Sequence, residues 1–205
     1  MAERQRARPQ QERAVQTRRL LLDTAVGILD RHGIDRLTTT AVVREAHVSS
    51  GTFYRYFNDR TELLAVLREE AVHAISDDLM VSVVDALELD LDAALRLVVV
   101  TLVEGFERHR GVITAMVNQL PAGSNANVLP EIEADLHRLA SLLPRRHRPD
   151  LAPEQLEAVV FMLMGVLVST CLRIALARPP EVGREELVEL TVAMIGAGLK
   201  DFDRG

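Results

Sequence analysis

Residues 49–57, with the sequence SSGTFYRYF, gather the side chains best suited to binding another molecule, including four of the chain's seven aromatic residues. If this stretch is helical, Phe53 and Phe57 share one face, because residues four apart lie side by side on a helix. Tyr54 and Arg55 then point the other way. Their hydroxyl and guanidinium groups form hydrogen bonds readily, so the outer face is expected to contact something polar.

A second short helix is predicted just before this stretch, over residues 38–46 (TTTAVVREA), with Thr38 as its N-cap. A tight turn at residues 47–49 joins the two helices. Such a pair is a helix-turn-helix, whose second helix can lie in the major groove of DNA. The alternative is an ordinary helical hairpin packed into a core. The small residues that open the second helix and its outward hydroxyls speak against that alternative.

Two longer helices are predicted to position this helix-turn-helix. Residues 13–32 form an amphipathic helix that ends at Gly33. A long helix over about 60–87 follows a capping box made by Asp59 and Glu62. The two helices are therefore expected to be the scaffold that holds the binding helix.

Basic residues lie at both ends of this predicted DNA-binding domain, residues 13–60. Arg60 is at the first position of its helix, where the helix dipole disfavours a cation, and a nearby DNA phosphate would remove that penalty. Residues 1–12 are rich in Arg and Gln. They are expected to form a flexible basic arm that reaches phosphates or a minor groove, or else a plain solvated tail.

The rest of the chain, residues 61–205, is interpreted as a second helical domain. Further helices are predicted over residues 91–110, 112–120, 131–143, 154–178 and 184–201, with loops at 121–130 and 144–149. The loop at 144–149 is basic, and its arginines are interpreted as DNA contacts or, in preference, as residues of a solvated loop between helices. About nine helices and no convincing strand predict an all-α protein.

The apolar stretch over residues 158–177 is long enough to be considered as a membrane span. However, apolar residues in the predicted helix 154–178 alternate at spacings of four and three, which is typical of a helix-packing seam. A helix that is apolar on every side is also what two subunits share in a core. We therefore predict a homodimer that uses the last two helices, and no membrane span.

Net charge is unevenly distributed along the chain. Residues 1–60 hold 11 Arg against 7 Asp and Glu, whereas residues 61–205 carry a net charge of −10, which gives −6 for the whole chain. The basic excess therefore coincides with the helix-turn-helix, as contact with phosphates requires. The asymmetry supports two parts with different functions.

Other classes of protein find little support in the sequence. The six His residues show no metal-type spacing, no Gly-rich phosphate loop is present, and the single Cys171 excludes a disulfide framework. We therefore expect no enzyme activity, no cofactor and no metal. The N-terminal residues lack the apolar run of a signal peptide, so a cytoplasmic protein is expected.

The order of these parts resembles the TetR family of bacterial transcription regulators. The resemblance covers about residues 25–64, roughly a fifth of the chain, and its most specific part is GTFYRYF at 51–57 followed by Asp59 and Arg60. One departure lies in the turn, where the family usually has Gly and this chain has His47. His is among the few other residues that enter the left-handed region at small cost.

The resemblance implies a DNA-binding transcriptional regulator, most typically a homodimeric repressor of a palindromic double-stranded operator. It also implies a C-terminal ligand-binding and dimerisation domain, and release from DNA when a small molecule binds. By position, DNA contacts carry over to Thr39, Thr40, Ser50, Gly51, Thr52, Tyr54, Tyr56 and Arg60. Arg55 is added because it points outward and can bind guanine or phosphate.

A small apolar ligand is expected because the middle helices carry few charges, so a charged ligand would lose its hydration without gaining partners. The residues predicted to contact it are Thr101, Phe106, Met116, Gln119, Phe161, Met162 and Met164. Taken singly, each apolar residue of this set is better interpreted as ordinary core. A constitutive DNA-binding regulator without an effector is the alternative function.

Overall fold

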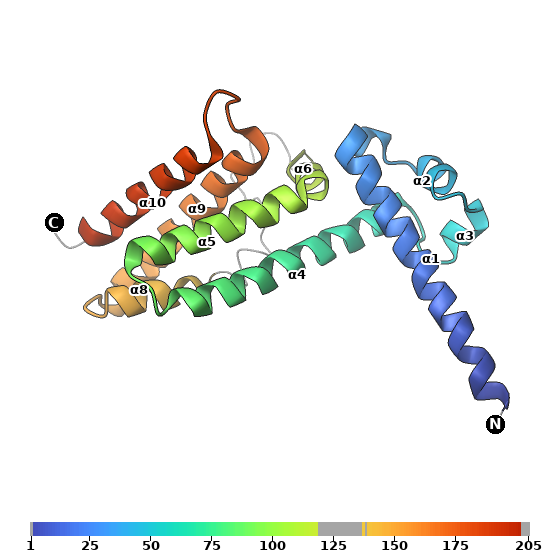
Figure 1. Ribbon diagram of the computed structural model, residues 1–205, viewed down its shortest axis with the longest axis horizontal. Coiled ribbons are helices and arrows are strands. Elements are labelled where there is room, and N and C mark those ends of the chain that lie inside the picture. The colour runs from blue at the N-terminus through green and yellow to red at the C-terminus, as the bar shows by residue number, and fades with distance from the viewer. Residues whose placement is uncertain (1, 119–136, 138, 202–205) are drawn as a thin grey trace. The chain divides into compact units, whose positions relative to one another are not determined.

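The structure, a computed structural model, describes residues 2–118, 137 and 139–201. These residues form nine α-helices and one 3-10 helix, with no strand among them (Figure 1). The predicted all-α fold is confirmed. The loop expected at 121–130 and most of the helix expected at 131–143 lie outside the described residues.

The first helix, α1, spans Ala2–His32 and therefore begins before the predicted start at residue 13. The structure thus continues the helix through the residues expected to form an arm. Apart from Met1 and Pro9, every residue of this segment is Ala, Glu, Gln or Arg, all of which are strong helix formers. Gly33, with a φ of 72°, ends α1 in the left-handed region, as predicted.

The short helices of the N-terminal part are η1 (Ile34–Arg36), α2 (Thr39–Glu45) and α3 (Ser50–Tyr54). The long helix α4 follows at Arg60–Ala86. It opens with the predicted capping interaction, since Asp59 Oδ1 accepts a hydrogen bond from the backbone N–H of Glu62 at 2.9 Å.

The second half of the chain contains α5 (Leu91–Arg108), α6 (Arg110–Asn118), α8 (Leu142–His147), α9 (Pro153–Ala177) and α10 (Arg184–Asp201). The loop predicted at 144–149 is wrong for its first four residues, which belong to α8. The reason is that Pro144 lies in the first turn of α8, where no N–H partner is lost. The basic residues that follow it lie in the last turn, where the helix dipole favours cations.

The chain divides into two compact units. One contains residues up to Ala71 together with α6 from Gly111 onward, and the other contains Val72–Arg110 with the C-terminal helices. Both α4 and the α5–α6 connection therefore pass from one unit into the other. The first unit is larger than the predicted domain 13–60, because half of α4 and most of α6 belong to it.

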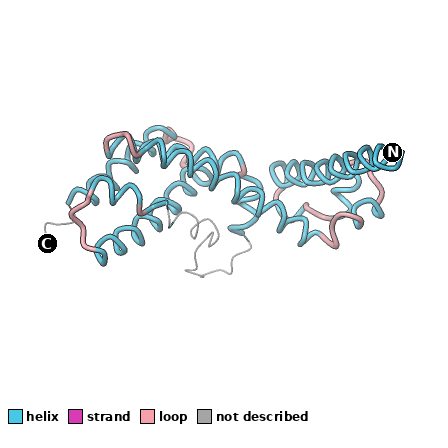
Figure 2. Tube along the Cα trace, turned by 90° about the horizontal axis from the view of Figure 1, so that it is seen from below, coloured by secondary structure: helices cyan, strands magenta, loops and turns pink. Residues whose placement is uncertain are grey.

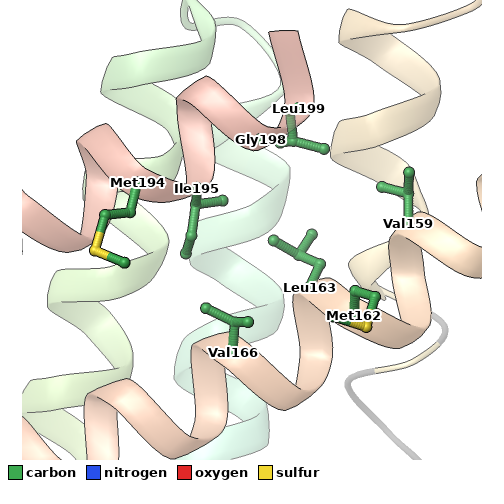
Figure 3. A pocket seen from close by; sticks show the side chains of 8 residues that line it. All are labelled: Val159, Met162, Leu163, Val166, Met194, Ile195, Gly198 and Leu199. Atoms are coloured by element: carbon green, nitrogen blue, oxygen red, sulfur yellow. The ribbon is translucent and has the colours of Figure 1, made fainter. Parts of the chain in front are cut away.

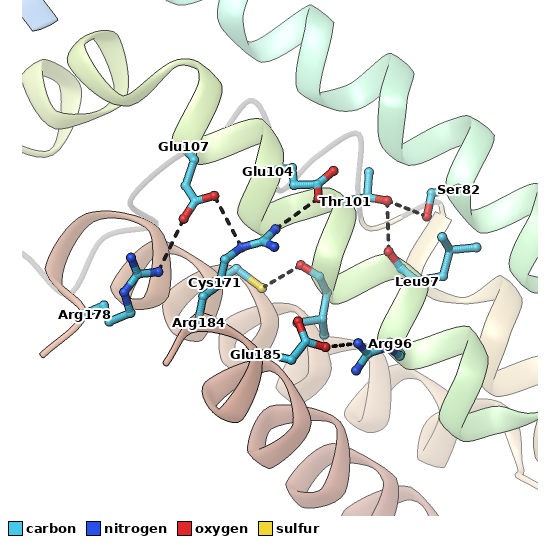
Figure 4. Close-up of polar contacts among 11 residues, drawn as sticks. Ser82, Arg96, Leu97, Thr101, Glu104, Glu107, Cys171, Arg178, Arg184 and Glu185 are labelled. Carbon is cyan, nitrogen blue, oxygen red and sulfur yellow. Dashed lines mark hydrogen bonds and ion pairs between the residues drawn. The ribbon is translucent and has the colours of Figure 1, made fainter. Parts of the chain in front are cut away.

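The described residues are helices joined by loops and turns (Figure 2). The core of the second unit is built by α5, which packs against α9 and α10 (Figure 1). Ion pairs run along the α5–α10 contact (Figure 4). Arg96 pairs with Glu185, and Arg184 pairs with Glu104 at 3.2 Å. Side chains in these pairs remain 30–58% exposed, so each pair stabilises the contact by less than about 1 kcal/mol. Their main effect is to fix which residues of α10 face α5.

Helix α9 is the one described helix that is long and apolar enough to cross a membrane, yet 56% of that stretch is buried inside the fold. Its buried residues include Leu163, Leu167 and Cys171. The helix therefore has the burial of a core helix on one side. Its other side carries exposed apolar residues, among them Phe161 and Met162.

Candidate DNA-binding site

The predicted binding helix α3 has the two faces that its sequence indicates. Phe53 and Phe57 are 0% and 2% exposed, and their ring centroids lie 5.7 Å apart in the core of the first unit. Tyr54 is 57% exposed on the opposite face, with its ring edge-on to Phe53. The apolar face thus anchors the helix and leaves the polar face open to solvent.

An N-cap opens each of the two helices, and the cap of α3 lies in the turn between them. Thr38 Oγ1 accepts from the Ala41 N–H at 3.1 Å, and Ser49 Oγ accepts from the Thr52 N–H at 3.1 Å. His47 takes a φ of 55°, the left-handed conformation that a Gly would adopt more easily. The structure therefore confirms a helix-turn-helix with His in the place of the turn glycine.

None of the nine residues predicted to contact DNA is buried. Five of them are exposed, namely Thr40, Ser50, Gly51, Tyr54 and Arg55, and four are partly exposed, namely Thr39, Thr52, Tyr56 and Arg60. Two of the nine already form side-chain hydrogen bonds within the protein. The Thr52 hydroxyl lies 2.9 Å from Ser49 Oγ, and Arg60 Nη1 donates to the Leu37 carbonyl at 3.1 Å.

The contacts that hold α1 to α4 behind the helix-turn-helix did not emerge from the sequence. Glu70 accepts a hydrogen bond from Arg19 at 3.0 Å and lies 3.7 Å from Arg18. The Arg18 guanidinium also lies over the Phe57 ring, 5.7 Å from its centroid. These partners are about 40–50 residues apart, so no local pattern links them.

A polar hollow of about 530 Å³ lies beside α2 in the same unit. Its lining includes Thr40 together with two basic residues that the sequence reasoning missed, Arg36 and Arg44. Both are exposed. Their only sequence signal is their charge, which the domain shares with many other arginines.

The second unit contains a small internal cavity of about 30 Å³. Its lining is wholly apolar and comes from α4, α5, α9 and the residues around α8. The residues are Leu79, Val83, Leu95, Val98, Leu102, Leu139, Ala140, Leu143, Leu163, Met164 and Leu167. A cavity of this size is far below the roughly 300 Å³ of the smallest typical ligand pocket.

The structure does not bring the predicted ligand residues together. Met164 lines the internal cavity, Phe106 is fully buried elsewhere in α5, and Met116 belongs to the first unit. The Thr101 hydroxyl lies 2.9 Å from the Leu97 carbonyl and 3.0 Å from Ser82 Oγ (Figure 4). Gln119 lies outside the described residues.

Phe161 and Met162, the remaining two predicted ligand residues, are 74% and 62% exposed on the outer side of α9. Met162 lines an apolar groove of about 380 Å³ between α9 and α10 (Figure 3). The other lining residues are Val159, Leu163, Val166, Met194, Ile195, Gly198 and Leu199. A helix that is apolar all round gave no way to tell this outer side from the core.

Among the described residues, no three His, Cys, Asp or Glu side chains come together as a metal site. Burial raises the pKa of the Cys171 thiol to about 12, so this thiol stays protonated and unreactive at neutral pH.

Comparisons with known proteins agree with the two-part organisation. Residues 21–67 match the family described as bacterial regulatory proteins, tetR family. Residues 90–197, more than half of the chain, match the family described as tetracyclin repressor-like, C-terminal domain. The chain is 24% identical over 164 residues to the HTH-type transcriptional regulator BetI of Cronobacter sakazakii, covering 80% of this chain and 81% of BetI.

Solved structures share the fold across nearly the whole chain. The SmeT–triclosan complex has a TM-score of 0.64 at 22% identity, covering 89% of this chain and 90% of SmeT. A tetR-family transcriptional regulator from Streptomyces coelicolor has a TM-score of 0.65 at 23% identity, covering 92% of this chain and 84% of that one. With both its DNA-binding and its C-terminal regions matched, this chain belongs to the TetR family of bacterial regulatory proteins.

Proposed function

We propose that this DNA-binding transcriptional regulator acts as a homodimeric repressor of a palindromic operator and is released from DNA by a small apolar ligand. The observation that carries the DNA-binding part is the two-faced helix α3. Its phenylalanine face is buried, while Tyr54 and Arg55 are exposed on the other side. A helix anchored in this way can enter a major groove without unfolding its own core.

The DNA-contacting residues are proposed to divide by chemistry. Ser50, Tyr54 and Arg55 on α3 are placed to reach base edges or nearby phosphates, with Arg55 suited to guanine through its two-pronged guanidinium. The partly exposed Thr39 and Tyr56, together with Thr40, Gly51 and Thr52, are proposed to contact phosphates. Arg36 and Arg44 extend the positive charge beside Thr40 and are added to the phosphate-contacting set.

A homodimer is supported by the groove between α9 and α10. Met162 and Met194 on its rim are 62% and 66% exposed, although both are large apolar side chains. Such a patch on a soluble protein is typical of a subunit interface. A two-fold dimer presents two identical α3 helices, which explains why the operator is proposed to be palindromic.

The test is selection of bound duplexes from a random-sequence DNA pool by the full-length protein. An inverted repeat should be enriched, with each half read by one α3 helix. Arg55→Ala should weaken binding to the selected duplex about 10- to 100-fold, the loss expected for one bidentate base contact. Arg145→Ala in α8, also exposed, is the matched control and should leave binding unchanged. A single unrepeated site, or no enrichment, would refute the proposal.

The ligand part of the proposal is supported by the wholly apolar lining of the internal cavity and by the fold shared with SmeT, which was solved with triclosan. Because the cavity measures only about 30 Å³, a ligand must separate the helices that line it. A ligand releases DNA only if it prefers the DNA-free form. A hundredfold release requires about 2.7 kcal/mol of such preference.

This part is tested by adding triclosan and other uncharged apolar compounds to the protein–duplex complex while DNA release and thermal stability are followed. Val98→Ile adds a methyl group to the cavity lining and should weaken ligand binding. Val81→Ile, on an exposed part of α4, is the matched control and should leave ligand binding unchanged. Compounds that bind without releasing DNA would show that the cavity is not regulatory, and the constitutive alternative would then hold.

A further inference from the structure

The carbonyl of Leu37, at the start of the helix-turn-helix, needs a hydrogen-bond donor from outside its own helix. Leu37 is the C-cap of η1, its side chain is fully buried, and the next residue is the N-cap of α2. Carbonyl groups at a helix end lack an N–H partner within that helix. An unpaired carbonyl here would weaken the junction between η1 and α2. Arg60 supplies the partner, since its Nη1 donates to this carbonyl at 3.1 Å.

The donor, Arg60, lies in a helical turn that other hydrogen bonds hold in place. Arg60 is the first residue of α4, and hydrogen bonds hold the turn on which it sits. Asp59 Oδ1 accepts from the Glu62 N–H at 2.9 Å, while Glu62 Oε2 accepts from the Asn58 N–H at 2.6 Å. The hydrogen bond that Arg60 donates is partly buried. The contact therefore connects the start of α4 to the junction between η1 and α2, across 23 residues of sequence.

Helix α2 is also held at its other end by an arginine. Arg31 of α1 pairs with Glu45, the last residue of α2, and its Nε donates to the Gly27 carbonyl at 2.9 Å. This second pair is more exposed, with 53% of the Arg31 side chain open to solvent. Solvent screening makes it the weaker of the two restraints. The half-buried Arg60 contact is accordingly the stronger restraint on the position of α2.

We infer that Arg60 is a positioning residue, which fixes α2, and through the α2–α3 contact the reading helix α3, against the start of α4. This inference rests on the proposed function and changes the role first expected for Arg60. A cation in the first turn of α4 is opposed by the helix dipole, and a phosphate was expected to offset that penalty. The Leu37 carbonyl does so within the protein, before any DNA is bound.

The first test uses the DNA-free full-length protein and compares Arg60→Gln with Arg60→Lys by amide hydrogen exchange. The N–H groups of Ala41 and Val42 bond to the Thr38 side chain and carbonyl, beside Leu37. Losing a charged donor should speed their exchange about tenfold in the Gln variant. The Lys variant, which keeps a charged donor, should restore part of the protection. Arg55→Gln, whose side chain is exposed, is the matched control and should leave exchange unchanged.

The second test measures DNA affinity as a function of salt, with a duplex selected by the wild-type protein and a random-sequence duplex. A misplaced α3 loses base contacts, so Arg60→Gln should lower the ratio of the two affinities about tenfold without changing the salt dependence. A pure phosphate contact would instead weaken both duplexes equally and reduce the salt slope by about 0.9.

Unchanged exchange in the DNA-free Arg60→Gln protein would overturn the positioning role, and so would an unchanged affinity ratio. If the wild-type protein selects no duplex at all, the proposed function fails instead. In that case the exchange measurement still tests whether the Arg60–Leu37 hydrogen bond holds α2 in place, because it requires no DNA.

Discussion

The backbone N–H of Gly111, in the first turn of α6, donates a hydrogen bond to the carboxylate of Asp30, in the last turn of α1, at 3.0 Å. A Cβ atom at Gly111 would lie 2.8 Å from the Asp30 backbone nitrogen and 3.0 Å from the Leu29 carbonyl carbon. The two helices therefore meet at a distance that only glycine allows. The residue before it, Arg110, donates to the Ala175 and Leu176 carbonyls of α9.

Replacing Gly111 by Ala should destabilise the first unit by about 1–3 kcal/mol, since backbone atoms of α1 would have to move. Urea denaturation measures this change. The matched control is Gly27→Ala in α1, whose new Cβ would meet only the flexible end of Arg31 at 3.3 Å. That variant should be neutral or up to about 1 kcal/mol more stable, because Ala is the better helix former. Equal stability of Gly111→Ala and wild type would contradict the close approach.

The positive φ of His47 predicts opposite effects for two substitutions in the turn. His47→Gly should be neutral or stabilise the protein by up to about 1 kcal/mol, because the strain in the left-handed region offsets the greater chain entropy of Gly. His47→Val should destabilise it by about 1–2 kcal/mol, because a β-branched residue tolerates this conformation poorly. Thermal unfolding of the three proteins gives the order, and a Val variant as stable as the Gly variant would exclude the strained turn.

The features predicted from sequence are those that neighbouring residues determine. Thr38 caps α2, Phe53 and Phe57 share a buried face, and His47 occupies the left-handed turn, as their types and spacing indicate. All three depend on residues within about one helical turn. Local patterns of this kind fix where a short helix begins and which side it buries.

The contacts that the sequence did not indicate join distant residues. Arg60 and Leu37 are 23 positions apart, and Gly111 and Asp30 are 81 apart. Phe161 shows a second reason why some site residues could not be predicted from the sequence. It was expected to line a ligand pocket but is 74% exposed, because a helix that is apolar on every side does not reveal which side faces the core.

The buried thiol of Cys171 predicts a loss of stability in alkaline solution. Its pKa rises from 9.0 to about 12 in the folded protein because burial disfavours the thiolate. Above pH 9 the unfolded chain releases the thiol proton and the folded chain keeps it, so the free energy of unfolding falls as pH rises between 9 and 12. Cys171→Ala should remove this part of the pH dependence. Denaturation of both proteins at pH 8 and pH 10.5 measures it, and identical slopes would contradict the buried thiol.

The apolar groove between α9 and α10 predicts that the protein is a dimer in solution at micromolar concentration. Met162 and Met194 line the groove and are mostly exposed in one protomer, so a charge placed there should not disturb the protomer's own core. In a dimer, however, the same charge would be buried without a partner, which is costly enough to separate the subunits. Met194→Glu should therefore give a monomer of 22.8 kDa by light scattering, while wild type gives about twice that mass.

Val81→Glu, at a 63% exposed position on α4, is the control and should remain dimeric. Circular dichroism of both variants should match wild type, so that loss of the dimer is not confused with unfolding. A wild-type mass of 22.8 kDa would overturn the homodimer, and with it the proposed palindromic operator.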